Sequence, residues 1–196
     1  MSLVCDKYIN PEFGKDGILS KLTFNIPENF NFGYDVVDVL AEKCPDKRAL
    51  IYLTNDKKET VFSFSDISRY SNMTANYFRS LGIQKGDRVM LVLKRHYQFW
   101  FSIIALHKLG AIVIPATHLL TKKDFVYRFQ AAGVKAIICT AEGEVSDHVD
   151  ASLPECPETT IKVLVNGKKE GWHDFNEEFK AFSDKLERVD TKADEL

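Results

Sequence analysis

The sequence lacks the long apolar runs and the charge excess that mark proteins of membranes or of nucleic acids. No stretch approaches the ~20 apolar residues of a membrane-spanning helix, and Ser102 interrupts the longest run, Phe99 to Leu106. The 26 basic and 28 acidic residues give a formal net charge of −2, so no general attraction to polyanions is expected. With 45% hydrophobic residues among 196, the composition is that of a soluble globular protein.

Cysteine is scarce, and its spacing excludes a zinc site. The four cysteines form no C-x-x-C pair and have no histidine at metal-ligand spacing. Free thiols fit a reducing compartment. The stretch from Met1 to Lys21 has neither the apolar core of a secretory signal nor the composition of an organelle transit peptide. We therefore expect a cytoplasmic protein without a metal site in this chain.

The motifs of several enzyme classes are also missing. There is no G-x-G-x-x-G, no G-x-x-x-x-G-K-S/T and no G-x-S-x-G, so neither a complete nucleotide site nor a hydrolase elbow is expected. The five histidines show no spacing that indicates a catalytic triad, and no catalytic residue is assigned. His107 falls on a buried-looking helix and is expected to be a hydrogen-bonded core or edge residue.

The first part of the chain predicts few regular elements. Residues 1–32 show no clear periodicity and are expected to form an extended arm lying on the rest of the fold. Tyr34 to Cys44 has helical spacing, and Pro45 blocks its continuation. Two short runs with strand character, Ala49–Leu53 and Thr60–Phe64, flank a polar turn and predict a β-hairpin.

From residue 65 onward, helices and strands alternate, with glycines or prolines between them. Ser65 is expected to cap the first of these helices. Apolar runs that do not alternate are typical of strands buried on both faces of a parallel sheet. The predicted helices are 65–81, 97–109, 125–132 (after a capping pattern at 121–124) and 175–182, and the predicted strands are 88–93, 111–114, 134–140 and 161–165. The fold class is α/β: a mostly parallel sheet with helices on both faces, plus the β-hairpin.

Ligands of such sheets bind at the carboxyl ends of the strands, which directs attention to the loops after Leu93, Ile114 and Thr140. His118 lies in the second of these loops, where either a ligand contact or a surface role is open. The helix start at 121–124 could hold a phosphate with its backbone N–H groups and two lysines. The alternative is a capped surface helix with solvated lysines.

Three segments, in this order, carry a resemblance to a known family. They are FSFSDISRYSNMTANYFRSLGIQKGDRV from Phe62, FSIIALHKLGAIVIP from Phe101, and Val126-Tyr127-Arg128 followed by Lys135-Ala136-Ile137-Ile138. The stretch 62–140 resembles the adenylate-forming, AMP-binding acyl-CoA synthetases. Further features look like the medium-chain branch, which includes fatty-acid and aryl-acid CoA ligases. These are Lys94-Arg95 before Phe99-Trp100, the Pro115-Ala116-Thr117 loop, Glu155-Cys156-Pro157, and Gly171-Trp172.

The resemblance implies a ligase that activates a carboxylic acid with ATP as an acyl adenylate and transfers the acyl group to CoA, with Mg²⁺ offsetting charge. It implies that 33–196 is the N-terminal part of the large domain, cut before the phosphate-binding loop expected soon after Leu196. The remainder of that domain and a C-terminal domain would be its partners. We therefore expect this chain alone to be inactive, to bind no cofactor and to expose apolar surface where the remainder packs.

One functional position carries over from the resemblance. In the medium-chain branch a polar residue at about the position of Leu119 contacts CoA, which makes Thr117, His118 and Leu119 the candidate CoA-binding loop. Leucine offers no side-chain amide, so the contact here is either backbone or apolar, or absent. Acyl-chain specificity and oligomeric state are not predicted.

Three hypotheses follow for the chain as a whole. The first is a fragment of an acid–CoA ligase. The second is a stand-alone, non-catalytic module of the same ancestry that binds an acyl group, CoA or a protein. The third, an unrelated nucleotide-binding α/β protein, has the least support. The reading frame beyond Leu196 separates the first two, because only the first requires the missing loop.

Overall fold

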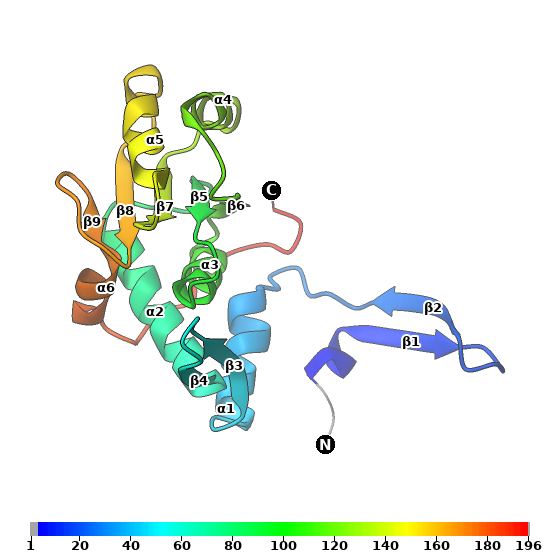
Figure 1. Cartoon of the computed structure of the whole chain (residues 1–196). Coiled ribbons are helices and arrows are strands. Elements are labelled where there is room, and N and C mark those ends of the chain that lie inside the picture. The colour runs from blue at the N-terminus through cyan, green and yellow to red at the C-terminus, as the bar shows by residue number, and fades with distance from the viewer. Residues whose placement is uncertain (1–3, 196) are drawn as a thin grey trace.

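A parallel sheet of five strands forms the centre of the structure, a computed structural model that describes residues 4–195 (Figure 1). The strand order is β6-β5-β7-β8-β9, and each neighbouring pair is parallel. The strands are β5 (Arg88–Val92), β6 (Ile112–Pro115), β7 (Ala136–Thr140), β8 (Ile161–Val165) and β9 (His173–Asp174). The predicted parallel sheet is confirmed, and β9 is an addition that the sequence did not predict.

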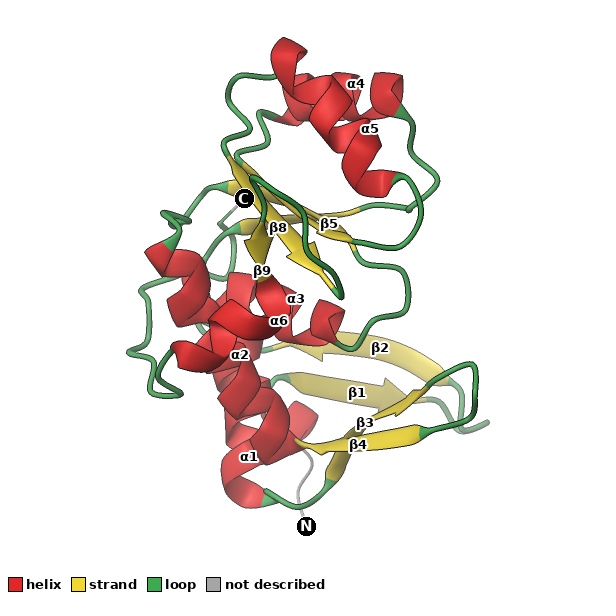
Figure 2. Cartoon of the chain, turned by 60° about the vertical axis from the view of Figure 1, so that its left-hand side comes forward, coloured by secondary structure: helices red, strands yellow, loops and turns green. Residues whose placement is uncertain are grey.

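Helices cover both faces of this sheet (Figure 2). Val89 and Leu91 of β5 pack against one set of helices, whereas Met90 and Val92 pack against the other. Because successive strand residues point to opposite faces, this unbroken apolar run serves both layers. One layer contains α2 (Phe64–Ser80), α3 (Gln98–Leu109) and α6 (Phe175–Glu178), and the other contains α4 (Lys122–Ala132) and α5 (Val145–Ser152). The sequence did not predict α5.

The helix termini mostly follow the predicted capping residues. Gly110 and Gly133 end α3 and α4 in the left-handed conformation, with φ of 70° and 59°. The predicted cap of α2 at Ser65 is wrong, because Ser63 caps this helix. The Ser63 hydroxyl accepts from the Asp66 N–H at 3.1 Å, and the Asp66 carboxylate accepts from the Ser63 N–H at 3.0 Å. This reciprocal pair favours the earlier serine.

The strand predicted over 111–114 as buried is β6, which forms an edge of the sheet. Its residues Ile112 to Ile114 are only half-buried, and Pro115 belongs to the strand. Proline is tolerated there because one side of an edge strand needs no N–H donor. An apolar run of this length does not tell an edge strand from a central one.

The predicted hairpin is confirmed as β3 (Arg48–Leu53) paired with β4 (Glu59–Ser63). Its inner face holds the buried Phe62, whose ring lies 5.0 Å from that of Tyr97 and 5.4 Å from that of Phe101 of α3. Its outer face leaves Ile51 and Leu53 open, with 50% and 59% exposure.

Residues 4–32 contain a second hairpin where an extended arm was predicted. A 3₁₀ turn at Val4–Lys7 precedes β1 (Ile9–Phe13), which pairs antiparallel with β2 (Leu19–Phe24). Both strands project from the body (Figure 1), and neither contains a buried residue. Tyr8, just before β1, is buried against Phe30 and provides the anchor.

A helical segment and the C-terminal residues close the fold. A π-helix, Gly33–Asp38, continues into α1 (Val39–Lys43). The fully buried Lys108 of α3 donates to Asp38 at 2.6 Å, to Ser71 at 3.1 Å and to Asn72 at 2.7 Å, which joins three helical elements.

After α6 and a 3₁₀ turn at Phe179–Ala181, residues 183–195 run back across α2 to the N-terminal part of the chain. Arg188 donates to Asp35 at 2.7 Å and to the carbonyl of Asn29 at 2.6 Å. No helix within 4–195 combines the length and the apolar content that a membrane crossing needs.

Candidate ligand site at the carboxyl ends of the strands

The predicted loop lies between β6 and α4, at the carboxyl end of the sheet. Thr117, His118 and Leu119 are all exposed, and Leu119 is open to 75%. The Thr117 hydroxyl accepts from the Leu119 N–H at 3.3 Å, which stabilises the turn. Leu120 is buried and fixes the end of the loop. The structure therefore brings the three residues together on one surface turn, and their contact with a ligand stays a prediction.

The loop after β5 provides a second set of charged groups. Lys94 has a φ of 22°, a left-handed value that residues other than glycine rarely adopt. Its Nζ lies 2.9 Å from a carboxylate oxygen of Glu142, which follows β7. This hydrogen bond is the main cause that lowers the pKa of Glu142. Sequence reasoning named the loop after β5 but did not assign a role to Lys94 or Glu142.

His96 forms the buried support beneath this pair. Its Nε2 lies 2.8 Å from the Thr140 hydroxyl and its Nδ1 lies 3.1 Å from the Asn166 amide nitrogen. The Asn166 amide oxygen accepts from Gln98 and Asn176, so its nitrogen faces His96 as the donor. Nδ1 then accepts, and Nε2 carries the proton.

Burial lowers the pKa of His96, and the nearby Glu142 carboxylate opposes that effect. The imidazole is therefore neutral at physiological pH and acts as a structural hydrogen-bonding group. The Thr140 hydroxyl also accepts from the Glu142 N–H at 3.1 Å. The carboxyl ends of β5, β7 and β8 are thus joined by one polar network.

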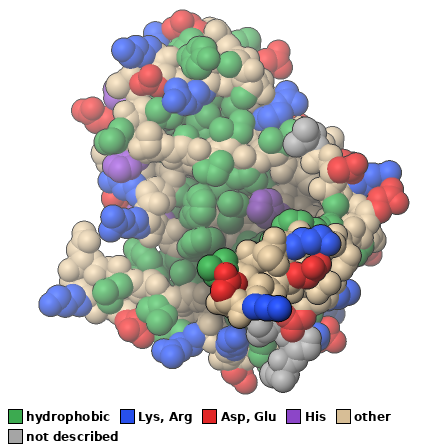
Figure 3. All heavy atoms as spheres, turned by 90° about the vertical axis from the view of Figure 1, so that its right-hand side faces the viewer, with side chains coloured by type: hydrophobic (Ala, Val, Ile, Leu, Met, Phe, Trp, Pro, Cys, Tyr) green, Lys and Arg blue, Asp and Glu red, His purple; other side chains and the backbone are tan. Residues whose placement is uncertain are grey.

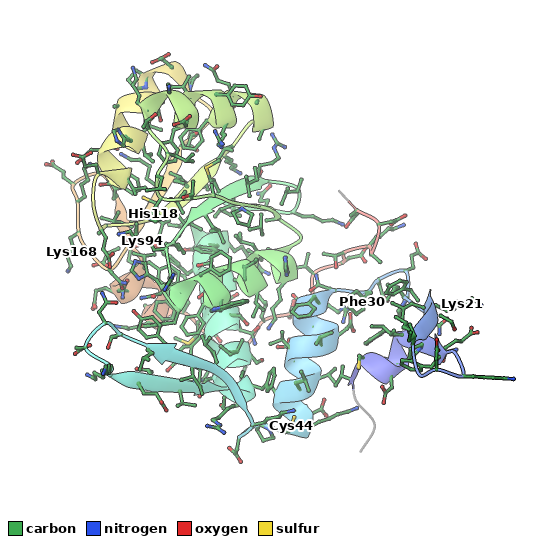
Figure 4. The ribbon with its side chains drawn as sticks, turned by 45° about the vertical axis from the view of Figure 1, so that its right-hand side comes forward. Lys21, Phe30, Cys44, Lys94, His118 and Lys168 are labelled. Carbon is green, nitrogen blue, oxygen red and sulfur yellow. The ribbon has the colours of Figure 1, made fainter. Side chains whose placement is uncertain are left out.

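A cavity of about 590 Å³ opens above this network. Lys94, Arg95, His118 and Glu142 line one side, and residues 52–55 of the β3–β4 hairpin line the other. Figure 4 shows Lys94 and His118 near each other, on the opposite side of the molecule from Lys21 of β2. The cavity thus connects the predicted loop with the charged residues that sequence reasoning missed.

The start of α4 is closed by its own residues. The Asp124 carboxylate accepts from the Thr121 N–H at 2.9 Å and from the Thr121 hydroxyl at 2.7 Å. Lys122 lies 2.7 Å from a carboxylate oxygen of Glu155. These contacts favour the capped surface helix over a phosphate site at this position.

A further cavity lies at the opposite end of the sheet. It measures about 860 Å³ and is lined in part by Gly86, which precedes β5, and by Ala111, which precedes β6. Hydrophobic side chains gather in the middle of the face that Figure 3 shows. His107 lines this cavity, and its buried Nδ1 has no hydrogen-bond partner among the described residues. The hydrogen bond expected of His107 is therefore not formed at Nδ1. Among residues 4–195, no group of three or more His, Cys, Asp or Glu side chains could hold a metal ion.

Comparisons with known proteins show which family this chain belongs to. The AMP-binding enzyme family matches residues 37–196. The acyl-coenzyme A synthetase ACSM5, mitochondrial, of Rattus norvegicus is 36% identical over 159 residues, which are 78% of this chain and 27% of that protein. The acyl-coenzyme A synthetase ACSM4, mitochondrial, of Mus musculus is 35% identical over 177 residues, which are 87% of this chain and 30% of that protein.

Two solved structures share the fold. The anthranilate CoA ligase AuaEII in complex with anthranoyl-AMP matches with a TM-score of 0.71 and 22% identity, over 85% of this chain and 31% of that one. The Brucella canis acyl-CoA synthetase matches with a TM-score of 0.72 and 24% identity, over 84% of this chain and 30% of that one. The chain thus spans less than a third of the length of these relatives, and it belongs to the AMP-binding enzyme family.

Proposed function

We propose that this chain is the N-terminal part of an AMP-forming acid–CoA ligase. The protein would convert a carboxylic acid and ATP into an acyl adenylate and pyrophosphate, and would then transfer the acyl group to CoA. The observation that carries this proposal is the family match over residues 37–196. The names of the acyl-CoA synthetase relatives support an acyl group as the group transferred, and the resemblance to the medium-chain branch favours a fatty acid or an aryl acid as its source.

The residues of this chain would contribute a scaffold and one surface loop. At that loop, the Thr117 hydroxyl and the backbone groups of the exposed turn can form hydrogen bonds to CoA, whereas the Leu119 side chain offers only apolar contact. Among residues 4–195, no group of three or more His, Cys, Asp or Glu side chains is placed to hold Mg²⁺. No side chain of the chain is assigned to bond making or breaking.

The exposed apolar residues support a partner for the N-terminal hairpin. Six large apolar side chains of residues 9–26 are between 39% and 66% exposed: Phe13, Ile18, Leu19, Leu22, Phe24 and Ile26. A two-stranded hairpin is marginally stable unless one face is packed. We therefore propose that the remainder of the large domain in a longer protein covers this hairpin, and that the C-terminal domain completes the enzyme.

The location of the protein in the cell belongs to the same proposal. The composition of residues 1–21 predicts the cytoplasm, whereas the names of the relatives describe mitochondrial enzymes. Fractionation of cells that express the protein with a C-terminal tag decides between these two compartments.

Pyrophosphate exchange tests the function directly. The 196-residue chain is expected to exchange no labelled pyrophosphate into ATP with any acid, because we assign no catalytic residue to it. A protein extended through the reading frame beyond Leu196 should show exchange with a fatty or aryl acid. Exchange by the short chain would contradict the fragment assignment, and a stop codon directly after Leu196 would favour the non-catalytic module.

A further inference from the structure

The cavity at the amino end of the sheet lies apart from the candidate ligand site. It measures about 860 Å³ and is lined by residues from 30–32, 85–86, 107–112 and 191–195. The candidate site, in contrast, lies at the carboxyl ends of the same strands. Figure 4 shows Phe30, which lines this cavity, on the other side of the view from Lys94 and His118. We call it the amino-end cavity.

The backbone of two glycines forms part of its surface. The Gly86 N–H donates to the Gly110 carbonyl at 2.9 Å, which holds the two residues side by side. Both have a left-handed φ, of 82° and 70°. A Cβ on Gly110 would come within 2.9 Å of Thr191 and 3.0 Å of Lys85, so a side chain has no room there. The glycines thus present bare backbone that a planar ligand can approach closely.

The charged groups at the rim of the cavity are already paired. Lys85 lies 2.6 Å from a carboxylate oxygen of Glu195 and donates to the Asp190 carbonyl at 2.8 Å. Lys192 lies 3.0 Å from a carboxylate oxygen of Glu28. A charged ligand would have to replace one of these partners and would gain little by the exchange, since surface ion pairs are weak. The cavity therefore favours a neutral ligand.

One polar side chain of the cavity lacks a partner. The Asn31 amide nitrogen donates to the His107 carbonyl and to the Thr191 hydroxyl, and its amide oxygen accepts from the Gly33 N–H. The His107 ring, in contrast, forms no hydrogen bond with any of residues 4–195, and its Nδ1 is buried. Burial lowers the pKa of His107, so the imidazole is neutral. A ligand can therefore reach only Nε2, which donates in one neutral tautomer and accepts in the other.

An exposed aromatic ring stands next to this imidazole. Phe32 is 48% exposed, and its ring centroid lies 6.3 Å from that of His107, with the two planes at 87°. Phe30, in the same cavity, is held by Tyr8 at 4.9 Å between ring centroids. A ligand beside Phe32 would remove apolar surface from water, and an aromatic ligand would add a ring contact.

We propose that the amino-end cavity binds a neutral aromatic alcohol, with its ring against Phe32 and the glycine backbone and its hydroxyl at Nε2 of His107. A hydroxyl both donates and accepts, so it complements either tautomer of the imidazole. The volume of about 860 Å³ leaves room for a bicyclic ring system. The proposal rests on this cavity alone and is independent of the ligase reaction, in which the carboxylic acid, ATP and CoA are all anionic.

Titrations of the 196-residue chain by NMR at neutral pH test the proposal. The probes are 2-naphthol, decahydro-2-naphthol, which lacks the aromatic rings, and naphthalene-2-sulfonate, which carries a charge in place of the hydroxyl. At millimolar concentration, 2-naphthol should shift the amide signals of residues 30–33, 85–86 and 110–112. The other two probes should bind at least about fivefold more weakly. Equal affinity for the sulfonate, or shifts confined to residues 94–96 and 117–119, would overturn the proposal.

Single substitutions separate the hydrogen bond from the ring contact. His107→Phe keeps a ring and should weaken 2-naphthol about fivefold while changing the sulfonate little. Phe32→Ala should also weaken 2-naphthol about fivefold. Phe24→Ala is the matched control, because Phe24 is a phenylalanine of β2 outside the cavity and is 61% exposed. The proposal fails if Phe24→Ala weakens 2-naphthol as much as Phe32→Ala does, or if His107→Phe leaves its affinity unchanged.

A second copy of the chain is the alternative occupant of the cavity. It would shift the same amide signals when the protein alone is concentrated, and 2-naphthol would then cause no further shift; that result also overturns the proposal. The amide spectrum of each variant reports whether it is folded. If His107→Phe does not fold, Phe32→Ala still decides the matter, because it truncates a side chain that is half exposed.

Discussion

The two β-hairpins of this molecule have the same pairing and opposite surroundings. In β3–β4, Phe62 enters a cluster of rings from α2 and α3, and its side chain is 8% exposed. In β1–β2, Phe13 and Phe24 are 63% and 61% exposed. Tyr8, just before β1, packs against Phe30. Both hairpins thus have paired strands, and they differ in how far their aromatic side chains are buried. Among the described residues, the apolar side chains of β1–β2 are thus left open to solvent, whereas Phe62 of β3–β4 is packed.

The largest effect should come from removing the anchor of the packed hairpin. Phe62→Ala should lower the free energy of unfolding by about 3–5 kcal/mol, because a buried aromatic side chain leaves a cavity. Phe24→Ala, at an exposed position in the other hairpin, should cost less than about 0.5 kcal/mol. Urea denaturation followed by circular dichroism measures both. Equal losses at the two positions would remove the distinction between the hairpins.

The next largest loss of stability should come from breaking the buried contact between Lys108 and Asp38. Asp38→Ala leaves the buried ammonium of Lys108 without its carboxylate, although Ser71 and Asn72 still accept from it. Burial already lowers the pKa of Lys108, and Asp38 opposes this shift. We expect a loss of about 2 kcal/mol in the free energy of unfolding.

The double variant Asp38→Ala with Lys108→Met is the control for this prediction. Removal of both charges should recover part of the stability, because no uncompensated charge then remains buried. If the double variant loses more free energy of unfolding than the two single variants lose together, the ion pair is not the cause.

The junction of β4 with α2 should respond more modestly. Ser63→Ala removes the cap of α2 and should cost about 1 kcal/mol. Ser20→Ala in β2 is the counterpart in the first hairpin, where the hydroxyl donates to the Glu12 carbonyl at 2.9 Å on the surface. That change should cost less than about 0.5 kcal/mol. Thermal unfolding of the two variants side by side shows whether the cap matters more than the exposed hydrogen bond.

The smallest effect concerns pH at the carboxyl ends of the strands. Burial holds the pKa of His96 below the ordinary value of 6.5, so at mildly acidic pH the unfolded chain binds more protons than the folded chain. The stabilisation is complete above pH 6.5 and is lost as the pH falls from there through the lower pKa of the folded state. His107, whose pKa burial also lowers, acts in the same direction.

Unfolding measured at pH 7.5 and 5.5 tests this dependence. His96→Gln should reduce the loss of stability between the two values. Residues 9–24 contain no histidine, so amide signals of β1–β2 should keep their positions over this range. A pH dependence that is unchanged in His96→Gln would exclude His96 as a source.

The sheet could be predicted because its determinants are local. The unbroken apolar run of β5, the glycines after α3 and α4, and the Thr121–Asp124 pair each act within a few residues. The pairing of β1 with β2 was not predicted, because the alternation of Ile9, Pro11 and Phe13 with polar residues is too short to give residues 1–32 a clear periodicity. The edge position of β6 depends on strand order, which no local pattern contains.

The prediction of the candidate site from the sequence had the same limit. Its position at the carboxyl end of β6 follows from the strand and the general rule for open sheets, and the structure places Thr117 to Leu119 there. The groups that surround this loop come from distant parts of the chain. Lys94 and Glu142 are 48 residues apart, and His96 and Asn166 are 70 apart. One sequence alone does not reveal such pairs, because nothing in either segment specifies the other.

The ion pair between Arg188 and Asp35 joins residues 153 positions apart. Contacts of this separation carry the largest loop-closure entropy and form late in folding. During synthesis, this ion pair can form only when nearly the whole described chain is present, whereas Asn31 can donate to the His107 carbonyl once α3 has been made. The segment next to the N-terminal hairpin is thus secured in two stages, first on α3 and then by the C-terminal residues.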